Sequence, residues 1–153
     1  YGQYFDVVIC NDSGLYFEEL DFEDLRQPGL NIRTPMNMDR LSDEEMIDYY
    51  SKLIAGLGGK VTAYYLDGIA VYNHGVISSF MDNMAAQKNG LFYMIDKASS
   101  KRFEGWPLDS LSINKENGKY FVDGSIEESK ENIIKDQYQK SVVDFLIKSL
   151  HIA

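Results

Sequence analysis

The sequence predicts an α+β fold: a single domain over residues 1–153, with an antiparallel sheet built from hairpins and about three helices packed mainly on one face. Three observations lead to this prediction. Short runs of β-branched and aromatic residues alternate with segments of helical periodicity. Tight turn sequences join several of these runs, and such turns require antiparallel neighbours. With 153 residues, 44% hydrophobic and 25% charged, the chain has the size and composition of one globular domain.

The first elements are predicted to be a hairpin and a helix. Residues 4–10 and 15–17 are β-branched and aromatic, and the turn-forming sequence Asn11-Asp12-Ser13-Gly14 separates them. Residues 21–40 contain two prolines and a glycine that interrupt any long element. A helix is predicted over 42–57, because Ser42 and Glu45 form a capping box, apolar residues follow at helical spacing and Gly58-Gly59 ends the run.

The central part is predicted to contain a second hairpin, a helix and a strand. Residues 60–66 and 69–73 flank Asp67-Gly68, a common two-residue hairpin turn. The apolar residues between 75 and 88 recur with helical spacing, so a second helix is expected there. Residues 91–96 are expected to form another strand.

The last third is predicted to contain a third hairpin and a long helix. Residues 111–113 and 119–122 bracket Asn117-Gly118, which is typical of a tight turn. Ser125, with Glu128 three residues later, is expected to cap a helix that continues to the C-terminus.

The charge of the chain is strongly asymmetric. Residues 1–50 hold twelve carboxylates and three arginines, whereas the rest has twelve acidic and twelve basic residues, so the formal net charge of −9 belongs to the first third. An acidic protein is a poor ligand for nucleic acid phosphates, which excludes nucleic acid as an expected partner. A basic protein is the partner that this charge would attract.

The composition also limits the site types and the cellular location. Cys10 is the only cysteine, which excludes an internal disulfide and a cysteine zinc site, and two distant histidines do not predict a metal site. No apolar run reaches the length of a membrane span. No cofactor is expected. The single cysteine fits a reducing cytoplasm, while the first residue, Tyr1, indicates a processed or excised chain and leaves export open.

Two motifs with possible chemistry are weak. Cys10 and His74 are the only conceivable nucleophile and base, but Cys10 ends an apolar strand, where a small buried hydrophobic residue is the simpler interpretation. The glycines and lysine at 56–60 follow a helix and precede a strand, which is the reverse of the order in a phosphate-binding loop. No catalytic residue is predicted.

Two functional hypotheses follow from the sequence. The preferred one is a non-catalytic interaction module that presents an acidic N-terminal surface to a basic partner, similar to inhibitor or immunity proteins in charge alone. The alternative is a small enzyme or ligand-binding protein whose pocket between helix and sheet uses Cys10, His74 and carboxylates. The acidic residues could equally keep the protein soluble, and those at 43–45 could stabilise the N-terminus of their own helix through its dipole. The predicted partner-binding residues are Glu18, Glu19, Asp21, Glu23, Asp24, Asp43, Glu44 and Asp48.

Overall fold

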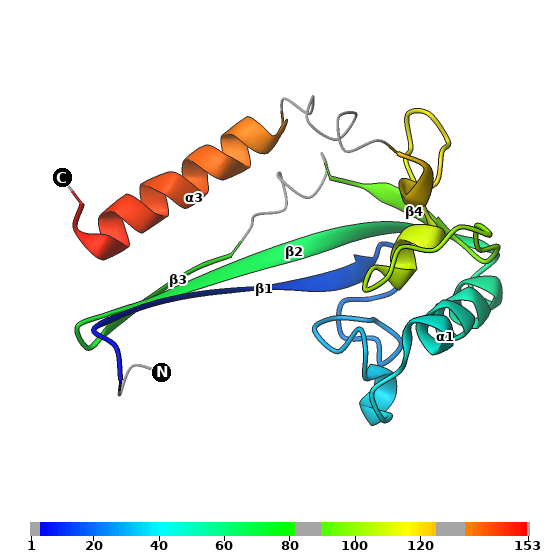
Figure 1. Cartoon of the computed structure of the whole chain (residues 1–153), viewed down its shortest axis with the longest axis horizontal. Coiled ribbons are helices and arrows are strands. Elements are labelled where there is room, and N and C mark those ends of the chain that lie inside the picture. The colour runs from blue at the N-terminus through cyan, green and yellow to red at the C-terminus, as the bar shows by residue number, and fades with distance from the viewer. Residues whose placement is uncertain (1–3, 82–89, 125–133, 153) are drawn as a thin grey trace. The chain divides into compact units, whose positions relative to one another are not determined.

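The computed structural model describes residues 4–81, 90–124 and 134–152 (Figure 1). Within these residues the fold is α+β with a five-stranded sheet, which confirms the predicted class; the strand order is β1-β2-β4-β5, and β3 pairs with β2. The described residues contain two α-helices, where about three helices were predicted. The elements are β1 (Val7–Phe17), α1 (Asp43–Gly56), β2 (Lys60–Asn73), β3 (Val76–Met81), β4 (Phe92–Ile95), β5 (Ser112–Ile113) and α3 (Ile134–Leu150).

The chain divides into two compact units, each described by itself below. The described residues of the first unit come from Tyr1–Ser13, Tyr65–Gly90 and Asn132–Ala153, and those of the second from Gly14–Tyr64 and Leu91–Glu131. Strands β1 and β2 contribute residues to both units. The single domain over 1–153 stays a prediction.

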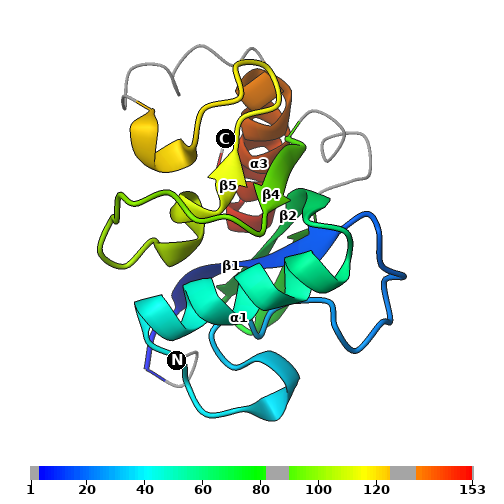
Figure 2. The same cartoon turned by 90° about the vertical axis from the view of Figure 1, so that its right-hand side faces the viewer.

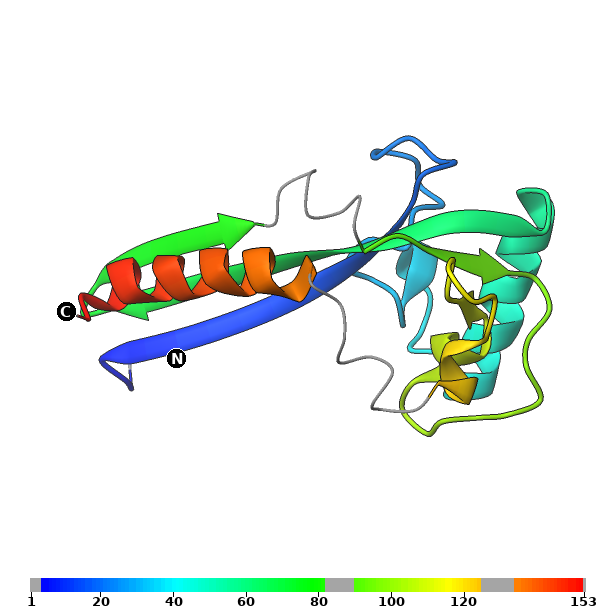
Figure 3. The same cartoon turned by 90° about the horizontal axis from the view of Figure 1, so that it is seen from above.

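The first unit is built on the hairpin of β2 and β3. The turn consists of His74 and Gly75, whose φ angles are 45° and 92°, and two positive φ angles are the geometry that joins antiparallel strands most tightly. Helix α3 packs on this hairpin (Figures 1 and 3). The rings of Phe80 and Phe145 stack with centroids 5.6 Å apart, and the side-chain amide of Asn73 donates to the carbonyl of Ser149 at 3.0 Å.

Two predictions for this region are wrong. Residues 76–81 of the predicted helix 75–88 form strand β3, because their backbone groups bond to β2, with Asn73 opposite Val76; residues 82–88 lie outside the described residues. Asp67-Gly68 is not a turn, since β2 runs through it without a positive φ angle. The chain reverses six residues later, at His74.

The predicted hairpin over residues 4–17 is also wrong, because β1 continues from Val7 to Phe17. None of the residues 11–14 has a positive φ angle. Contacts with β2 fix an antiparallel register: the amide of His74 donates to the carbonyl of Asp6 at 2.8 Å, and that of Glu18 donates to the carbonyl of Thr62 at 2.9 Å. Long pairing with β2 therefore overrides the local turn preference.

In the second unit, the outer edge of β1 is covered by the segment that follows it. Leu15 and Gly29 exchange two backbone hydrogen bonds of 3.0 and 2.8 Å. The side chain of Gln27 accepts from the amide of Phe17 and donates to its carbonyl, both at 2.8 Å, and donates to the carbonyl of Leu20 at 3.1 Å. The amide side chain thus bonds to Phe17 as a neighbouring strand would.

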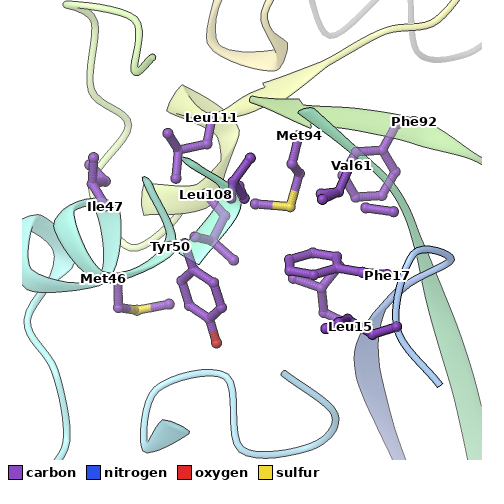
Figure 4. Packing of buried hydrophobic residues seen from close by; sticks show 13 residues of the cluster. Leu15, Phe17, Met46, Ile47, Tyr50, Val61, Phe92, Met94, Leu108 and Leu111 are labelled. Carbon is purple, nitrogen blue, oxygen red and sulfur yellow. The ribbon is translucent and has the colours of Figure 1, made fainter. Parts of the chain in front are cut away.

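The core of the second unit lies between α1 and the sheet. The predicted capping box is confirmed, with Glu45 bonded back to Ser42, and α1 packs beside β4 and a 3-10 helix at Pro107–Ser110 (Figure 2). Tyr50 is fully buried and donates its hydroxyl to the carbonyl of Ile32 at 2.9 Å. The buried cluster in Figure 4 includes Leu15, Phe17, Met46, Ile47, Tyr50, Val61, Phe92, Met94, Leu108 and Leu111.

The remaining predictions are confirmed in part. The strand predicted over 91–96 is β4. The turn at Asn117-Gly118 exists, since Ile113 and Tyr120 form an antiparallel bridge across it, but residues 121–123 form a 3-10 helix. The C-terminal helix is present as α3, and its predicted start at Ser125 lies outside the described residues. In the described part of the chain, no helix is long and apolar enough to cross a membrane.

Candidate functional site

The acidic segment 18–24 lies in the second unit, where several of its carboxylates serve the chain's own structure. Both carboxylate oxygens of Glu19 accept from the amide of Thr62, at 2.7 and 2.9 Å. Asp24 is ion-paired with Arg26 at 2.7 Å, and the hydrogen bonds from Arg26 lower the pKa of Asp24 to about 2. Glu18, Asp21 and Glu23 are exposed to solvent.

The three predicted residues on α1 are each ion-paired. Asp48 pairs with Lys52 at 2.6 Å and Glu44 with Arg102 at 2.7 Å. Asp43 accepts from the amide of Gly105 at 2.8 Å and from Arg33 at 2.9 Å, and these hydrogen bonds lower its pKa. Together with Glu19 and Asp24, five of the eight predicted partner-binding residues therefore bind other parts of this chain.

The structure does not bring Cys10 and His74 together. Cys10 is exposed, and its thiol donates to the carbonyl of Ala70 at 3.7 Å. The ring of His74 lies 4.0 Å from the carboxylate of Asp6. His74 follows Ala70, the residue that Cys10 contacts, by four positions along the chain. Four residues of extended strand span roughly 13 Å, so Cys10 and His74 lie far apart. The nucleophile–base pair considered for the alternative hypothesis is therefore not formed.

A different polar group lies at the centre of the β1–β2 pair in the first unit. The hydroxyl of Ser13 donates to a carboxylate oxygen of Asp67 across the two strands. The amide of Ser13 donates to a carboxylate oxygen of Asp12 at 2.9 Å. Both contacts come from the two segments that the sequence predicted as turns. The sequence signal for this cluster is the run Asp12-Ser13-Gly14 together with the pair Asp67-Gly68. The signal can be recognised only when the pairing of the two strands is known.

The two aspartates of this cluster have different surroundings. Consecutive residues of a strand point to opposite faces, so Ser13 and Asp67 share one face while Asp12 and Gly68 share the other. Asp12 is exposed and Asp67 is half-buried. Gly68 has no side chain that could cover Asp12. Even a Cβ added at Gly68 would lie 3.9 Å from the carbonyl oxygen of Asp12. Asp12 is the carboxylate that a ligand can approach, and the bond between Ser13 and Asp67 fixes its strand in register.

This geometry limits the chemistry of the site. An exposed carboxylate can accept a proton from water or coordinate a hard cation. Within the described residues, no group of three or more His, Cys, Asp or Glu side chains could hold a metal ion by itself. A cation at Asp12 would therefore take most of its ligands from water and from an anionic substrate.

Comparisons with known proteins report on the fold. No family model and no curated protein matches the sequence. Among solved structures, the Ham1 protein of Staphylococcus aureus covers 94% of this chain, with a TM-score of 0.61 and 19% identity. A Ham1 protein from Coxiella burnetii covers 93%, with a TM-score of 0.61 and 13% identity. A nucleoside-triphosphatase, or dITP/XTP pyrophosphatase, from Mycobacterium abscessus covers 90%, with a TM-score of 0.62 and 10% identity.

These likenesses correct the preferred functional hypothesis. The chain spans 69%, 68% and 64% of the lengths of the three solved chains, so its fold is similar to the larger part of each. One of the three is a nucleotide-hydrolysing enzyme. The hypothesis of a non-catalytic module with an acidic docking surface is wrong on this finding, which agrees better with the alternative of a small enzyme or ligand-binding protein. The residues named for that alternative, Cys10 and His74, do not form its site.

Proposed function

We propose that this protein hydrolyses nucleoside triphosphates and releases pyrophosphate, with Asp12 as the carboxylate that acts on the substrate. The observation that carries the proposal is the fold shared with the Mycobacterium abscessus pyrophosphatase over 90% of the chain. The exposed carboxylate of Asp12 supports it, because this group has the chemistry that the reaction needs and stands on a continuous strand of the sheet.

The proposed reaction adds water to a phosphoanhydride. An oxygen–phosphorus bond forms at the α-phosphorus, the bond from that phosphorus to the bridging oxygen breaks, and the proton of the attacking water needs an acceptor. The carboxylate of Asp12 is the proposed acceptor. Ser13 and Asp67 are positioning residues, since their hydrogen bond holds the two strands together at the level of Asp12.

A divalent cation enters this scheme as part of the substrate. Magnesium is usually held by one or two carboxylates, the substrate phosphates and water, without a complete protein cage. In this proposal the substrate phosphates and water hold the cation, which leaves the carboxylate of Asp12 free to accept the proton of the attacking water. The cation would neutralise the charge of the phosphates while the anhydride breaks.

The test is a pyrophosphate-release assay on the purified chain with magnesium and a panel of dITP, XTP, ATP and GTP. Asp12→Asn keeps the shape of the side chain and removes the proton acceptor, so kcat should fall by at least 10²-fold. Asp39→Asn, an exposed aspartate outside the site, removes the same charge and should leave kcat within twofold. Wild-type protein without pyrophosphate release on any of the four nucleotides would refute the proposal. Equal activity of Asp12→Asn and wild type would refute the role of Asp12.

A further inference from the structure

Gly68 lies in the interior of strand β2, at a position where the backbone does not require glycine. Its φ angle is not positive. A Cβ at this residue would meet one described atom within 4 Å, the carbonyl oxygen of Asp12 at 3.9 Å, which is an ordinary van der Waals contact. Alanine would therefore fit at position 68 without backbone strain and without a clash among the described residues.

The strand pairing around Gly68 contains no bulge that would call for glycine either. The hydrogen bonds at the two ends of the β1–β2 pair give the same register, so neither strand carries an extra residue between them. On its other side, β2 pairs with β3 without interruption from Gly68, opposite Met81, to Asn73, opposite Val76. Glycine weakens the interior of a strand, because it loses more backbone entropy on folding and has no side chain to pack. The described contacts of the fold do not explain why position 68 bears this cost.

The residues on either side of Gly68 leave its backbone open beside the Asp12 carboxylate. Strand β2 lies between β1 and β3 (Figure 3), with Asp12 opposite Gly68 on one side and Met81 on the other. Phe80, the residue before Met81, stacks on Phe145 of α3, so Asp12, Gly68 and Met81 share the face that points away from α3. Asp12 is exposed, and Met81 is 65% exposed. Because neighbouring strands are about 4.8 Å apart, roughly 10 Å separates β1 from β3 across Gly68.

A glycine inside a strand often marks a bulge, a tight bend or a place where a ligand or another backbone approaches closely. Gly68 has no positive φ angle, no bulge and no crowding backbone among the described residues, which leaves the approach of a ligand. We propose that Gly68 is a specificity-determining residue of the site at Asp12. The end of the substrate that reacts lies on the Gly68 backbone between Asp12 and Met81, and a side chain at position 68 would exclude it. The inference rests on the proposed hydrolysis, in which Asp12 accepts the proton of the attacking water.

The first experiment measures pyrophosphate release from dITP with magnesium by the full chain, for wild type, Gly68→Ala and Gly68→Leu. KM should rise with the size of the side chain, roughly threefold for alanine and roughly 20-fold for leucine, while kcat changes less, because the side chain blocks access and leaves Asp12 itself unaltered. Ser79→Leu is the matched control. Ser79 is exposed on the same face of β3, opposite Ala70, and this variant should keep KM within about twofold of wild type. Gly68→Leu with the KM of wild type would overturn the inference.

Urea denaturation of the same variants separates access to the site from a structural role of glycine. Gly68→Ala should unfold at the same urea concentration as wild type or at a higher one, since alanine has room at this position and loses less entropy on folding. A lower midpoint for Gly68→Ala would mean that the backbone needs glycine here, and would also overturn the inference.

A labelling experiment distinguishes failure of this inference from failure of the proposed function. A carbodiimide couples glycine methyl ester to exposed carboxylates, and mass spectrometry gives the rate of modification at Asp12 without any need for turnover. Gly68→Leu should lower this rate several-fold, because the added side chain covers the carboxylate, whereas Ser79→Leu should leave it unchanged. Wild-type protein that releases no pyrophosphate would refute the hydrolysis, and the labelling would then decide the role of Gly68. Equal rates at Asp12 in Gly68→Leu and wild type would show that Gly68 does not open the way to this carboxylate.

Discussion

Replacing Gly14 by alanine should destabilise the protein, because β1 passes too close to its neighbours at this residue. A Cβ at Gly14 would lie 2.8 Å from a ring carbon of Tyr16 and 3.3 Å from the carbonyl carbon of Gly29. The Tyr16 ring cannot move away without cost, since it stacks on Phe22 at 4.9 Å and on Tyr64 at 5.8 Å between centroids. The φ angle of Gly14 is not positive, so the expected effect is steric and not conformational.

The magnitude follows from the two ways in which the clash can be relieved. Moving Tyr16 breaks two aromatic stacks, each worth about 0.5–1.5 kcal/mol. Moving the backbone of Gly29 weakens its two hydrogen bonds with Leu15, each worth about 0.5–1.5 kcal/mol. Alanine gains about 0.4–1 kcal/mol through the lower entropy of the unfolded chain. The net loss should be roughly 1–2 kcal/mol, or a fall in melting temperature of about 2–8 °C for a domain of this size.

Urea denaturation of four variants tests this reasoning. Gly56→Ala is the control: Gly56 ends α1 with no atom within 4 Å of its Cβ position, so alanine should stabilise there by about 0.5–1 kcal/mol. In a Tyr16→Ala background, Gly14→Ala should lose most of its destabilising effect. A neutral Gly14→Ala, or the same loss with and without the Tyr16 ring, would contradict the assignment of the strain to this contact.

Two further predictions concern single side chains. Asp24 should titrate with a pKa of about 2 because of its hydrogen bonds with Arg26, below the ordinary 3.8. Since the folded pKa is the lower one, this pair stabilises the fold above pH 3.8 and loses that contribution as the pH falls toward 2; NMR titration should show the pKa rising toward 3.8 in Arg26→Gln, and an unchanged value would contradict the cause. Tyr50→Phe should cost about 1–2 kcal/mol, because it leaves the carbonyl of Ile32 without its 2.9 Å hydrogen bond in the core. A denaturation midpoint equal to that of wild type would show that the bond contributes nothing.

Helix α1 was predictable because its determinants are local. Ser42 and Glu45 bond to each other within one turn, and the apolar spacing points to the face that the structure buries. Strand β4 and the turn at Asn117-Gly118 were predictable for the same reason, since a short apolar run and a turn sequence need no distant partner to be identified.

The turns of the long strands were not predictable, because they depend on pairing between distant residues. Asp67-Gly68 has the stronger turn sequence, yet the chain turns at His74-Gly75. That choice lets β2 continue along β1 as far as the bond between His74 and Asp6, and lets its residues 68–73 pair with β3, a gain that no local pattern contains. The same pairing converts residues 76–81 from an apparent helical stripe into a strand.

The candidate site could not be predicted, because the clearest feature of the sequence is its cluster of acidic residues, whereas the site depends on which residues the strand pairing places side by side. The acidic residues that dominate the sequence mostly bind the chain's own amides and cations, as Glu19 and Asp43 do. Asp12 was assigned to a turn and thereby left out. Only the register of β1 against β2 shows that it stands exposed, opposite a glycine, beside the bond between Ser13 and Asp67.

The amide side chain of Gln27 has a consequence for the behaviour of the protein at high concentration. An open strand edge is a template on which another molecule can add a strand, and this is how many proteins begin to aggregate. At Phe17 both backbone groups are already taken by Gln27, and at Leu15 both are taken by Gly29. The backbone groups of Leu15 and Phe17 are therefore not available to a strand from a second molecule, and at Phe17 a single glutamine side chain provides this protection.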